Sequence, residues 1–129
     1  QGNPLAHAIL RGSVNKYGRS LPNYHYEDLI SLCRLYDDIG LENPGVIVDV
    51  NHSNSNKIWQ ECPRIAKEVV RSAKNSEAIG GILKGLMIES YLEDGCQKPG
   101  ETTFGKSITD PCLGWEKTEQ LVLRLADIY

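Results

Sequence analysis

Three residues able to bind a divalent cation stand next to the ends of apolar segments. His52 follows a run of valines and isoleucine, Glu89 follows a second apolar run, and Asp110 lies in the loop after it. One imidazole and two carboxylates suit Mn²⁺, Fe²⁺ or Zn²⁺. Arg11 ends a further apolar run, and its guanidinium suits bidentate binding of a carboxylate or phosphate. Together the four side chains suit a metal site beside an anionic ligand.

Each of these residues also has a structural interpretation. A histidine at a strand end is often only hydrogen-bonded, and Arg11 can form an ion pair at the rim of a sheet. Asp110 can cap a turn or a helix, and Glu89 can pair with Lys106 or cap a turn, although an unpaired carboxylate is costly to bury. Asp49 is unusual inside an apolar run. We expect it to fix a histidine ring N–H or a loop amide, without a catalytic role.

An alternation of strands and helices positions these residues. Continuous β-branched runs bounded by turn residues are typical of parallel strands buried on both faces. Apolar residues at a period of 3.6 predict amphipathic helices. The predicted order is strand 6–12, loop 13–23, helix 24–39, strand 46–52, helix 58–73, strand 82–90, loop 92–113 and a helix from residue 115.

This order predicts an α/β fold whose right-handed crossovers make the strands parallel. Parallel strands end at one edge of the sheet, so the four candidate residues should converge on one rim. Three strands leave two edges unpaired. We therefore interpret residues 1–129 as a single partial domain, part of a doubly wound sheet or of a (β/α)₈ barrel. Open edges also predict self-association, and hence a homo-oligomer.

Composition narrows the functional classes. The 129 residues are 40% hydrophobic and 24% charged, as in ordinary globular domains. A net charge of −3 gives no reason to expect nucleic-acid binding, and no apolar run approaches membrane-spanning length. The four cysteines are widely spaced and form no CxxC pair, which argues against a zinc knuckle. Reduced thiols in a cytoplasmic protein are the expectation.

Five motifs follow one another along the chain. They are Gly2-Asn3-Pro4, Ile9-Leu10-Arg11-Gly12, Asp49-Val50-Asn51-His52-Ser53-Asn54-Ser55, Met87-Ile88-Glu89-Ser90 and Gly105-Lys106-Ser107-Ile108-Thr109-Asp110-Pro111-Cys112-Leu113-Gly114-Trp115-Glu116. In this order they resemble the C-terminal part of class I 3-deoxy-D-arabino-heptulosonate 7-phosphate (DAHP) synthases, enzymes of the shikimate pathway of aromatic amino acid biosynthesis. The resemblance covers essentially the whole chain, and the last motif is the most specific.

The resemblance implies that the chain forms the C-terminal three βα units of a (β/α)₈ TIM barrel. It implies a transferase that condenses phosphoenolpyruvate with erythrose 4-phosphate and releases phosphate, with a divalent metal (Mn, Fe, Zn or Co). His52, Glu89 and Asp110 then match metal ligands of the family, and Arg11 matches an arginine that binds phosphoenolpyruvate. The metal would polarise the aldehyde as a Lewis acid.

The departures from the family are informative. Its fourth metal ligand, a cysteine, and its substrate-binding Lys-Pro-Arg-Thr segment belong to earlier strands that this sequence does not cover. Neither Cys96 nor Cys112 stands at the position of that ligand, and Ser13 replaces a glycine. We therefore expect the isolated chain to lack full activity. Two alternatives stay open: a non-catalytic, self-associating module that binds a divalent metal or phosphate, and an unrelated small α/β domain that binds either.

Overall fold

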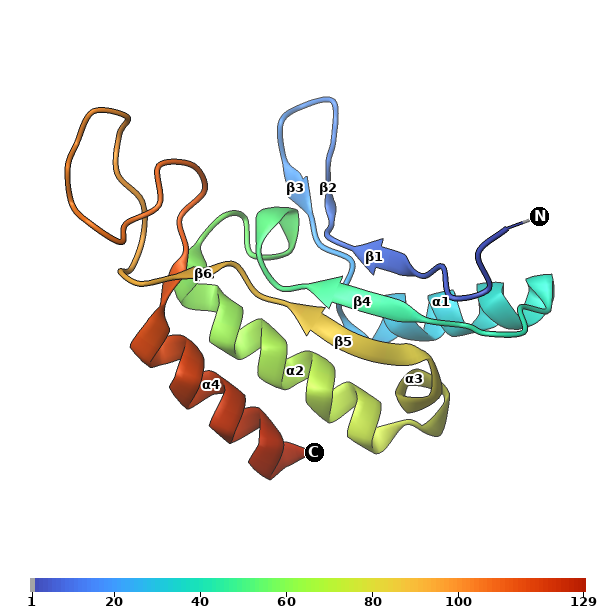
Figure 1. Cartoon of the computed structure of the whole chain (residues 1–129). Helices are drawn as coiled ribbons and strands as arrows, with labels where there is room; N and C mark the ends of the chain where they lie inside the picture. Colours follow the sequence, from blue (N-terminus) through green and yellow to red (C-terminus); the bar gives the residue numbers. More distant parts are fainter. Residues whose placement is uncertain (1) are drawn as a thin grey trace.

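Three parallel strands, β1 (Ala8–Leu10), β4 (Val46–Asp49) and β5 (Leu83–Met87), form the central sheet in the order β1-β4-β5. They are seen in a computed structural model that describes residues 2–129. Both strand pairings are parallel, and the three arrows point the same way in Figure 1. The predicted α/β fold with parallel strands is confirmed, and all three strands end at one rim.

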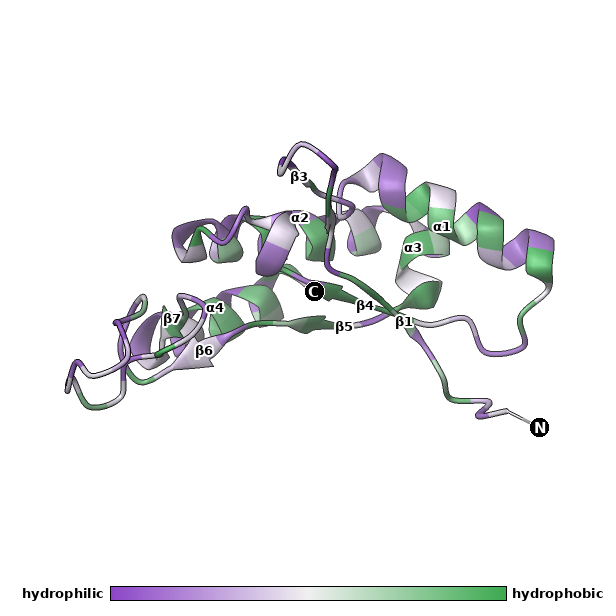
Figure 2. Cartoon of the chain, turned by 90° about the horizontal axis from the view of Figure 1, so that it is seen from above, coloured by the Kyte–Doolittle hydropathy of each residue, from purple (hydrophilic) through white to green (hydrophobic). Residues whose placement is uncertain are grey.

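The helices are α1 (Tyr26–Ile39), α2 (Cys62–Asn75), α3 (Glu77–Ile82) and α4 (Trp115–Ile128). Figure 2 shows α1, α2 and α3 on the same side of the sheet, and α4 packs beside α2. One face of the sheet is therefore covered by helices.

Among residues 2–129, no helix has the length and apolar character needed to span a bilayer.

The hydrophobic core fills the space between that face and the helices. Val46 and Val48 of β4 are fully buried there. The apolar stripe predicted at helical spacing is the buried face of α2, made of Cys62, Ile65, Ala66, Val69, Val70 and Ala73. This packing places β4, and the residues that follow it, at the centre of the fold.

The opposite face of the sheet is apolar but uncovered. Side chains alternate between the two faces of a strand, so Ile9 and its neighbour Ile47 point away from the core that holds Val46 and Val48. Ile9 is 45% exposed and Met87 is 37% exposed. Within residues 2–129, no helix lies across this face (Figure 2).

All three predicted strands are shorter than expected, spanning 8–10, 46–49 and 83–87, and two of their boundaries have a clear physical cause. Ile82 ends helix α3 instead of starting a strand, because the Ser76 hydroxyl accepts the Ile79 N–H and caps a short helix that leads directly into β5. The strand predicted to reach His52 ends at Asp49, where the chain turns. His52 has φ 38°, a left-handed conformation incompatible with a continuing strand.

The predicted loop 13–23 contains an antiparallel hairpin, β2 (Ser13–Val14) and β3 (Ser20–Leu21). The Asn15 side chain organises its tip by accepting the backbone N–H groups of Tyr17 and Arg19, at 2.9 and 3.0 Å. A local side-chain acceptor of this kind forms an Asx turn. The hairpin rises beside the rim of the sheet (Figure 1).

The long loop 92–112 is fixed at its base. Strand β6 (Ser90–Tyr91) pairs with β7 (Leu113–Gly114) in parallel. Above this pair, Gly95 and Cys112 exchange two backbone hydrogen bonds, at 2.8 and 3.0 Å. The chain therefore returns to the rim, next to the end of β5, shortly after Asp110. Short 3₁₀ turns, η1 (His52–Asn54) and η2 (Trp59–Glu61), complete the fold.

Gly12 joins β1 to the hairpin and allows its base to approach the turn after β4. Its φ is 68°, and a Cβ there would lie 2.8 Å from the Leu21 carbonyl oxygen and from the Ser53 Cβ. Gly18 at the hairpin tip has φ 77° but open space around the position of its Cβ. A comparison of the two glycines therefore distinguishes the cost of a left-handed backbone from the cost of a close contact at the position of the Cβ.

We predict that Gly12→Ala lowers the free energy of unfolding more than Gly18→Ala. Both substitutions carry the left-handed backbone cost of about 1–2 kcal/mol, and Gly12→Ala adds an overlap typically worth about 1–3 kcal/mol. Urea unfolding measures both values. Equal losses would show that the hairpin base does not depend on this contact.

Candidate metal centre

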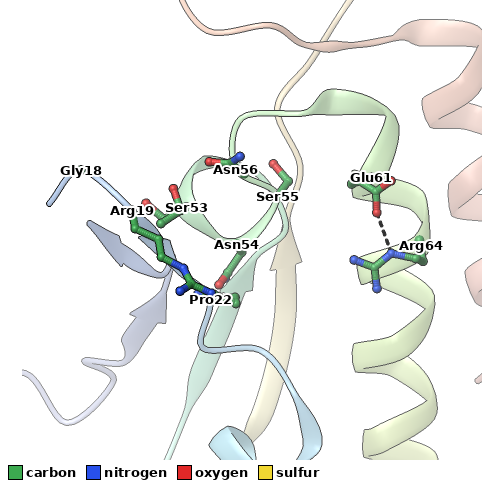
Figure 3. A pocket seen from close by; sticks show the side chains of 10 residues that line it. Gly18, Arg19, Pro22, Ser53, Asn54, Ser55, Asn56, Glu61 and Arg64 are labelled. Atoms are coloured by element: carbon green, nitrogen blue, oxygen red, sulfur yellow. Dashed lines mark hydrogen bonds and ion pairs between the residues drawn. The ribbon is translucent and has the colours of Figure 1, made fainter. Parts of the chain in front are cut away.

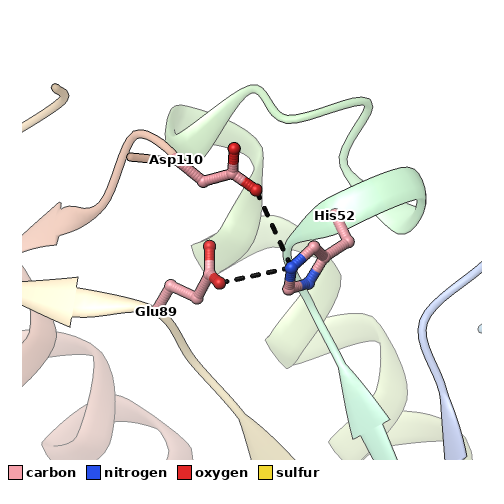
Figure 4. Close-up of side chains that lie close together, drawn as sticks. All are labelled: His52, Glu89 and Asp110. Carbon is pink, nitrogen blue, oxygen red and sulfur yellow. Dashed lines mark ion pairs between the residues drawn. The ribbon is translucent and has the colours of Figure 1, made fainter. Parts of the chain in front are cut away.

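The three side chains predicted to bind a metal lie together at the rim of the sheet, as Figure 4 shows. His52 Nε2 is 3.3 Å from Glu89 Oε1 and 3.8 Å from Asp110 Oδ2. One potential ligand atom from each residue lies within 4.8 Å of the others. All three side chains are partly buried. The predicted convergence is thus present, while the function of these residues as ligands stays a prediction.

Each candidate ligand follows a different structural element. His52 begins η1, directly after the turn that ends β4. Glu89 stands between β5 and β6, and Asp110 comes from the long loop shortly before β7. The predicted alternative partner of Glu89, Lys106, makes no ion pair with it within residues 2–129; Glu89 faces His52. The site therefore joins three chain segments that only the parallel sheet brings to one edge.

Asp49 explains the orientation of the histidine. Its carboxylate is 1% exposed. Oδ1 accepts the Asn51 backbone N–H at 2.8 Å, and Oδ2 lies 2.6 Å from His52 Nδ1. The sequence predicts that Asp49 contacts either a loop amide or a histidine ring, and it contacts both. A carboxylate on one ring nitrogen fixes the tautomer and directs the other nitrogen outward.

The donor set fits a divalent cation. With Nδ1 engaged by Asp49, His52 Nε2 points at two carboxylate oxygens. A divalent cation between this ring nitrogen and the two carboxylate oxygens would bind three acceptor atoms at once. A carboxylate behind a metal-ligating histidine is the usual arrangement at protein metal sites.

Asn51 positions the second candidate ligand. The buried Asn51 side chain accepts the Glu89 backbone N–H at 2.8 Å and donates to Cys62 Sγ at 3.1 Å. Burial raises the pKa of the Cys62 thiol to about 12, and the nearby Ser55 hydroxyl opposes this rise. Cys62 therefore stays protonated and acts as a structural acceptor, a role typical of a buried free cysteine.

Asn54 connects the neighbouring strand ends. Its amide nitrogen donates to the carbonyl oxygens of Asp49 at 2.7 Å and Leu10 at 3.1 Å. Its Oδ1 accepts the Asn23 backbone N–H at 2.8 Å. One buried amide thus ties the turn after β4 to the end of β1 and to the base of the hairpin.

Arg11 lies at the same rim but outside the cluster. It is exposed just beyond the carboxyl end of β1. In the part of the chain from residue 2 to residue 129, no hydrogen bond or ion pair joins its guanidinium to His52, Glu89 or Asp110. Its position suits contact with an anion above the sheet, and phosphoenolpyruvate binding by Arg11 stays a prediction.

The cysteines do not complete the site. All four thiols are free. The Cys112 thiol donates to the Asp110 backbone oxygen at 3.5 Å, and burial raises its pKa, which disfavours the thiolate that a metal requires. Cys96 is exposed. The candidate cation cluster in residues 2–129 includes neither.

A neighbouring pocket of about 420 Å³ lies between the hairpin and the start of α2 (Figure 3). Ser53 and Asn54 line it, but none of the three candidate ligands does. Arg64 on its wall is neutralised by Glu61 at 2.7 Å and Glu68 at 2.9 Å. Arg19 also lines the pocket, but within residues 2–129 the pocket lining contains no histidine or cysteine and so does not match the donor set around His52.

Two contributors to the site were missed from the sequence, Asn51 and Lys57. Lys57 Nζ donates to Asp110 Oδ1 at 2.8 Å. Both residues belong to the polar run that follows Asp49, and that run is the one signal available. A polar run shows that a strand has ended, but it does not show which side chains will meet others far along the chain.

Comparison with known proteins identifies the family. A sequence profile of the DAHP synthetase I family matches residues 1–123. The chain belongs to this family. It is 39% identical over 129 residues to the Trp-sensitive phospho-2-dehydro-3-deoxyheptonate aldolase of Escherichia coli K12, covering 97% of the chain and 34% of that relative.

Two further members extend the comparison. The Tyr-sensitive aldolase of Salmonella typhimurium LT2 is 36% identical over 126 residues, covering 95% of the chain and 33% of that relative. The solved structure of the Francisella tularensis SCHU S4 phospho-2-dehydro-3-deoxyheptonate aldolase superposes with a TM-score of 0.84 at 29% identity, covering 98% of the chain and 35% of that structure. The chain thus spans about a third of the length of these family members. The resemblance seen in the motifs is confirmed.

We predict that His52→Ala abolishes divalent-metal binding by this member of the DAHP synthetase I family, because it removes the one nitrogen donor of the cluster. Titration with Mn²⁺, followed by calorimetry or by the electron paramagnetic resonance signal of the free ion, measures the affinity. His7→Ala, an exposed histidine near the opposite end of the sheet, is the matched control. Unchanged Mn²⁺ affinity in His52→Ala would remove the cluster as a metal site.

Proposed function

We propose that this chain supplies the C-terminal part of a 3-deoxy-7-phosphoheptulonate synthase. This transferase condenses phosphoenolpyruvate with erythrose 4-phosphate in the first step of the shikimate pathway. The observation that carries the proposal is the cluster of His52, Glu89 and Asp110 at the carboxyl rim of a parallel sheet in a member of this family. The E. coli and Salmonella relatives are both phospho-2-dehydro-3-deoxyheptonate aldolases, which agrees with this reaction class. For such an enzyme we expect a cytoplasmic location.

The proposed architecture is the last three βα units of a (β/α)₈ barrel. The uncovered apolar face around Ile9, Ile47 and Met87 is the face that would line a barrel interior. The family members are about three times as long as this chain, which leaves room for five further units. Where the edges of β1 and β5 stay unpaired, they favour self-association, so the isolated chain is proposed to form a homo-oligomer.

In the proposed reaction, the residues of this chain bind a metal ion and orient the reacting groups. His52 Nε2, Glu89 and Asp110 would hold a divalent Mn, Fe, Zn or Co ion, and Asp49 keeps His52 Nδ1 protonated. When bound, such an ion supplies Lewis acidity toward an aldehyde oxygen. A fourth ligand comes from outside these residues.

Arg11 would bind the anionic end of phosphoenolpyruvate from the neighbouring strand. Carbon 3 of phosphoenolpyruvate then bonds to the aldehyde carbon of erythrose 4-phosphate. Water adds at carbon 2, and phosphate leaves, which gives DAHP. The proposed role of this chain in that sequence is to keep the rim groups in place before the substrates react.

The test joins residues 1–129 to the N-terminal two thirds of the E. coli Trp-sensitive aldolase and measures phosphoenolpyruvate consumption with erythrose 4-phosphate and Mn²⁺. We expect turnover by the hybrid and none by the isolated chain. In the hybrid, His52→Ala should cost more than about 100-fold, since loss of a direct ligand exceeds loss of an outer partner. A folded hybrid that binds Mn²⁺ without turnover would contradict the synthase assignment and favour a non-catalytic metal-binding module.

A further inference from the structure

We propose that Lys57 is a positioning residue that fixes which oxygen of Asp110 faces the metal centre, and that it thereby sets the affinity of the centre for divalent cations. This inference rests on the proposed function, because it concerns the same site. Lys57 Nζ donates to Asp110 Oδ1 at 2.8 Å. The other oxygen, Oδ2, is the one that lies 3.8 Å from His52 Nε2. The lysine thus occupies one oxygen and leaves the other for the cation.

The backbone of Lys57 is hydrogen-bonded to the backbone of His52. The Lys57 backbone N–H donates to the His52 carbonyl oxygen at 2.8 Å. Lys57 and its neighbour Asn56 have φ values of 58° and 53°, in the left-handed region that costs residues other than glycine about 1–2 kcal/mol each. Such conformations persist only where surrounding contacts hold them. Lys57 is therefore presented at a defined place beside one candidate ligand.

Asp110 depends on that placement. It lies in the long loop, 53 residues from Lys57, outside any helix or strand. Within residues 2–129, the ion-pair partners of its carboxylate are Lys57 Nζ at 2.8 Å and His52 Nε2 at 3.8 Å, so only Lys57 lies within hydrogen-bond distance. The nearby Cys112 thiol donates to the Asp110 backbone oxygen at 3.5 Å and not to its carboxylate. Lys57 is then the one group that selects the rotation of the carboxylate.

Positioning and simple charge make opposite predictions. A lysine near a metal repels it, so if Lys57 acted only as a charge, its removal would tighten cation binding. If Lys57 orients Asp110, its removal weakens binding, typically by about 10–100-fold for the loss of an outer partner. Because Lys57 is 60% exposed, its ion pair contributes little to folding stability. Metal affinity, and not stability, is therefore the informative measurement.

The experiment measures Mn²⁺ affinity by calorimetry for the wild-type chain and three variants. We expect Lys57→Met to weaken binding by about tenfold or more. Lys57→Arg, which retains a donor, should stay within a few-fold of wild type. Lys98→Met removes an exposed lysine of the same loop as Asp110 and should leave the affinity unchanged. Equal or tighter binding by Lys57→Met would overturn the inference.

A double-mutant cycle tests the route of the effect. In an Asp110→Ala background, Lys57→Met should cause no further loss of Mn²⁺ affinity, because the group it positions is gone. Additive losses would overturn the inference even if Lys57→Met alone weakened binding. If the wild-type chain bound no Mn²⁺, the proposed metal centre would fail together with the inference. If wild type and Lys57→Met bound Mn²⁺ equally, the inference alone would fail.

Discussion

The contact between the Asp49 carboxylate and the His52 ring governs the rest of this structure. A carboxylate that is 1% exposed needs partners, because an unpaired buried charge is strongly destabilising. Asp49 finds them in the Asn51 backbone N–H and in His52 Nδ1. Satisfying both requires β4 to stop and the chain to turn back, which places His52 in a left-handed conformation. The end of the strand and the orientation of the imidazole thus share one physical cause.

A layer of polar side chains connects the turn after β4 to the neighbouring strand ends along the rim. Below it, the strands contribute valine and leucine to the core. Above it, Asn54 binds carbonyl oxygens at the ends of β1 and β4, and Asn51 binds the backbone N–H of Glu89. Buried amides that satisfy strand-end groups are rigid, because breaking any one of them leaves an unpaired polar atom. The backbone around His52 and Glu89 is therefore fixed by buried hydrogen bonds, while Lys57 holds the side chain of Asp110 separately.

Much of this could be predicted from local sequence. The β-branched run before His52 and the helical stripe of α2 determine their own structures, and parallel topology then carries the strand ends to one rim. Helix α3, the hairpin and the partners of Asn51 and Lys57 could not be predicted in this way. They depend on a single capping hydroxyl at Ser76, an Asx turn at Asn15, or contacts between residues 38 and 53 positions apart. The strand-end pattern and the family resemblance both indicate His52, Glu89 and Asp110, and the apolar run around Asp49 indicates its contact with a histidine, but neither indicates the roles of Asn51 and Lys57.

The most direct measurement is anomalous diffraction from crystals of this chain grown with Mn²⁺. The account predicts one manganese peak at coordination distance from His52 Nε2, with Glu89 and the Oδ2 atom of Asp110 as the other protein ligands. Asp49 should remain hydrogen-bonded to Nδ1, and Lys57 should remain on Oδ1. A peak elsewhere on the molecule, or a His52 ring that bridges Glu89 and Asp110 with no manganese between them at saturating Mn²⁺, would contradict it.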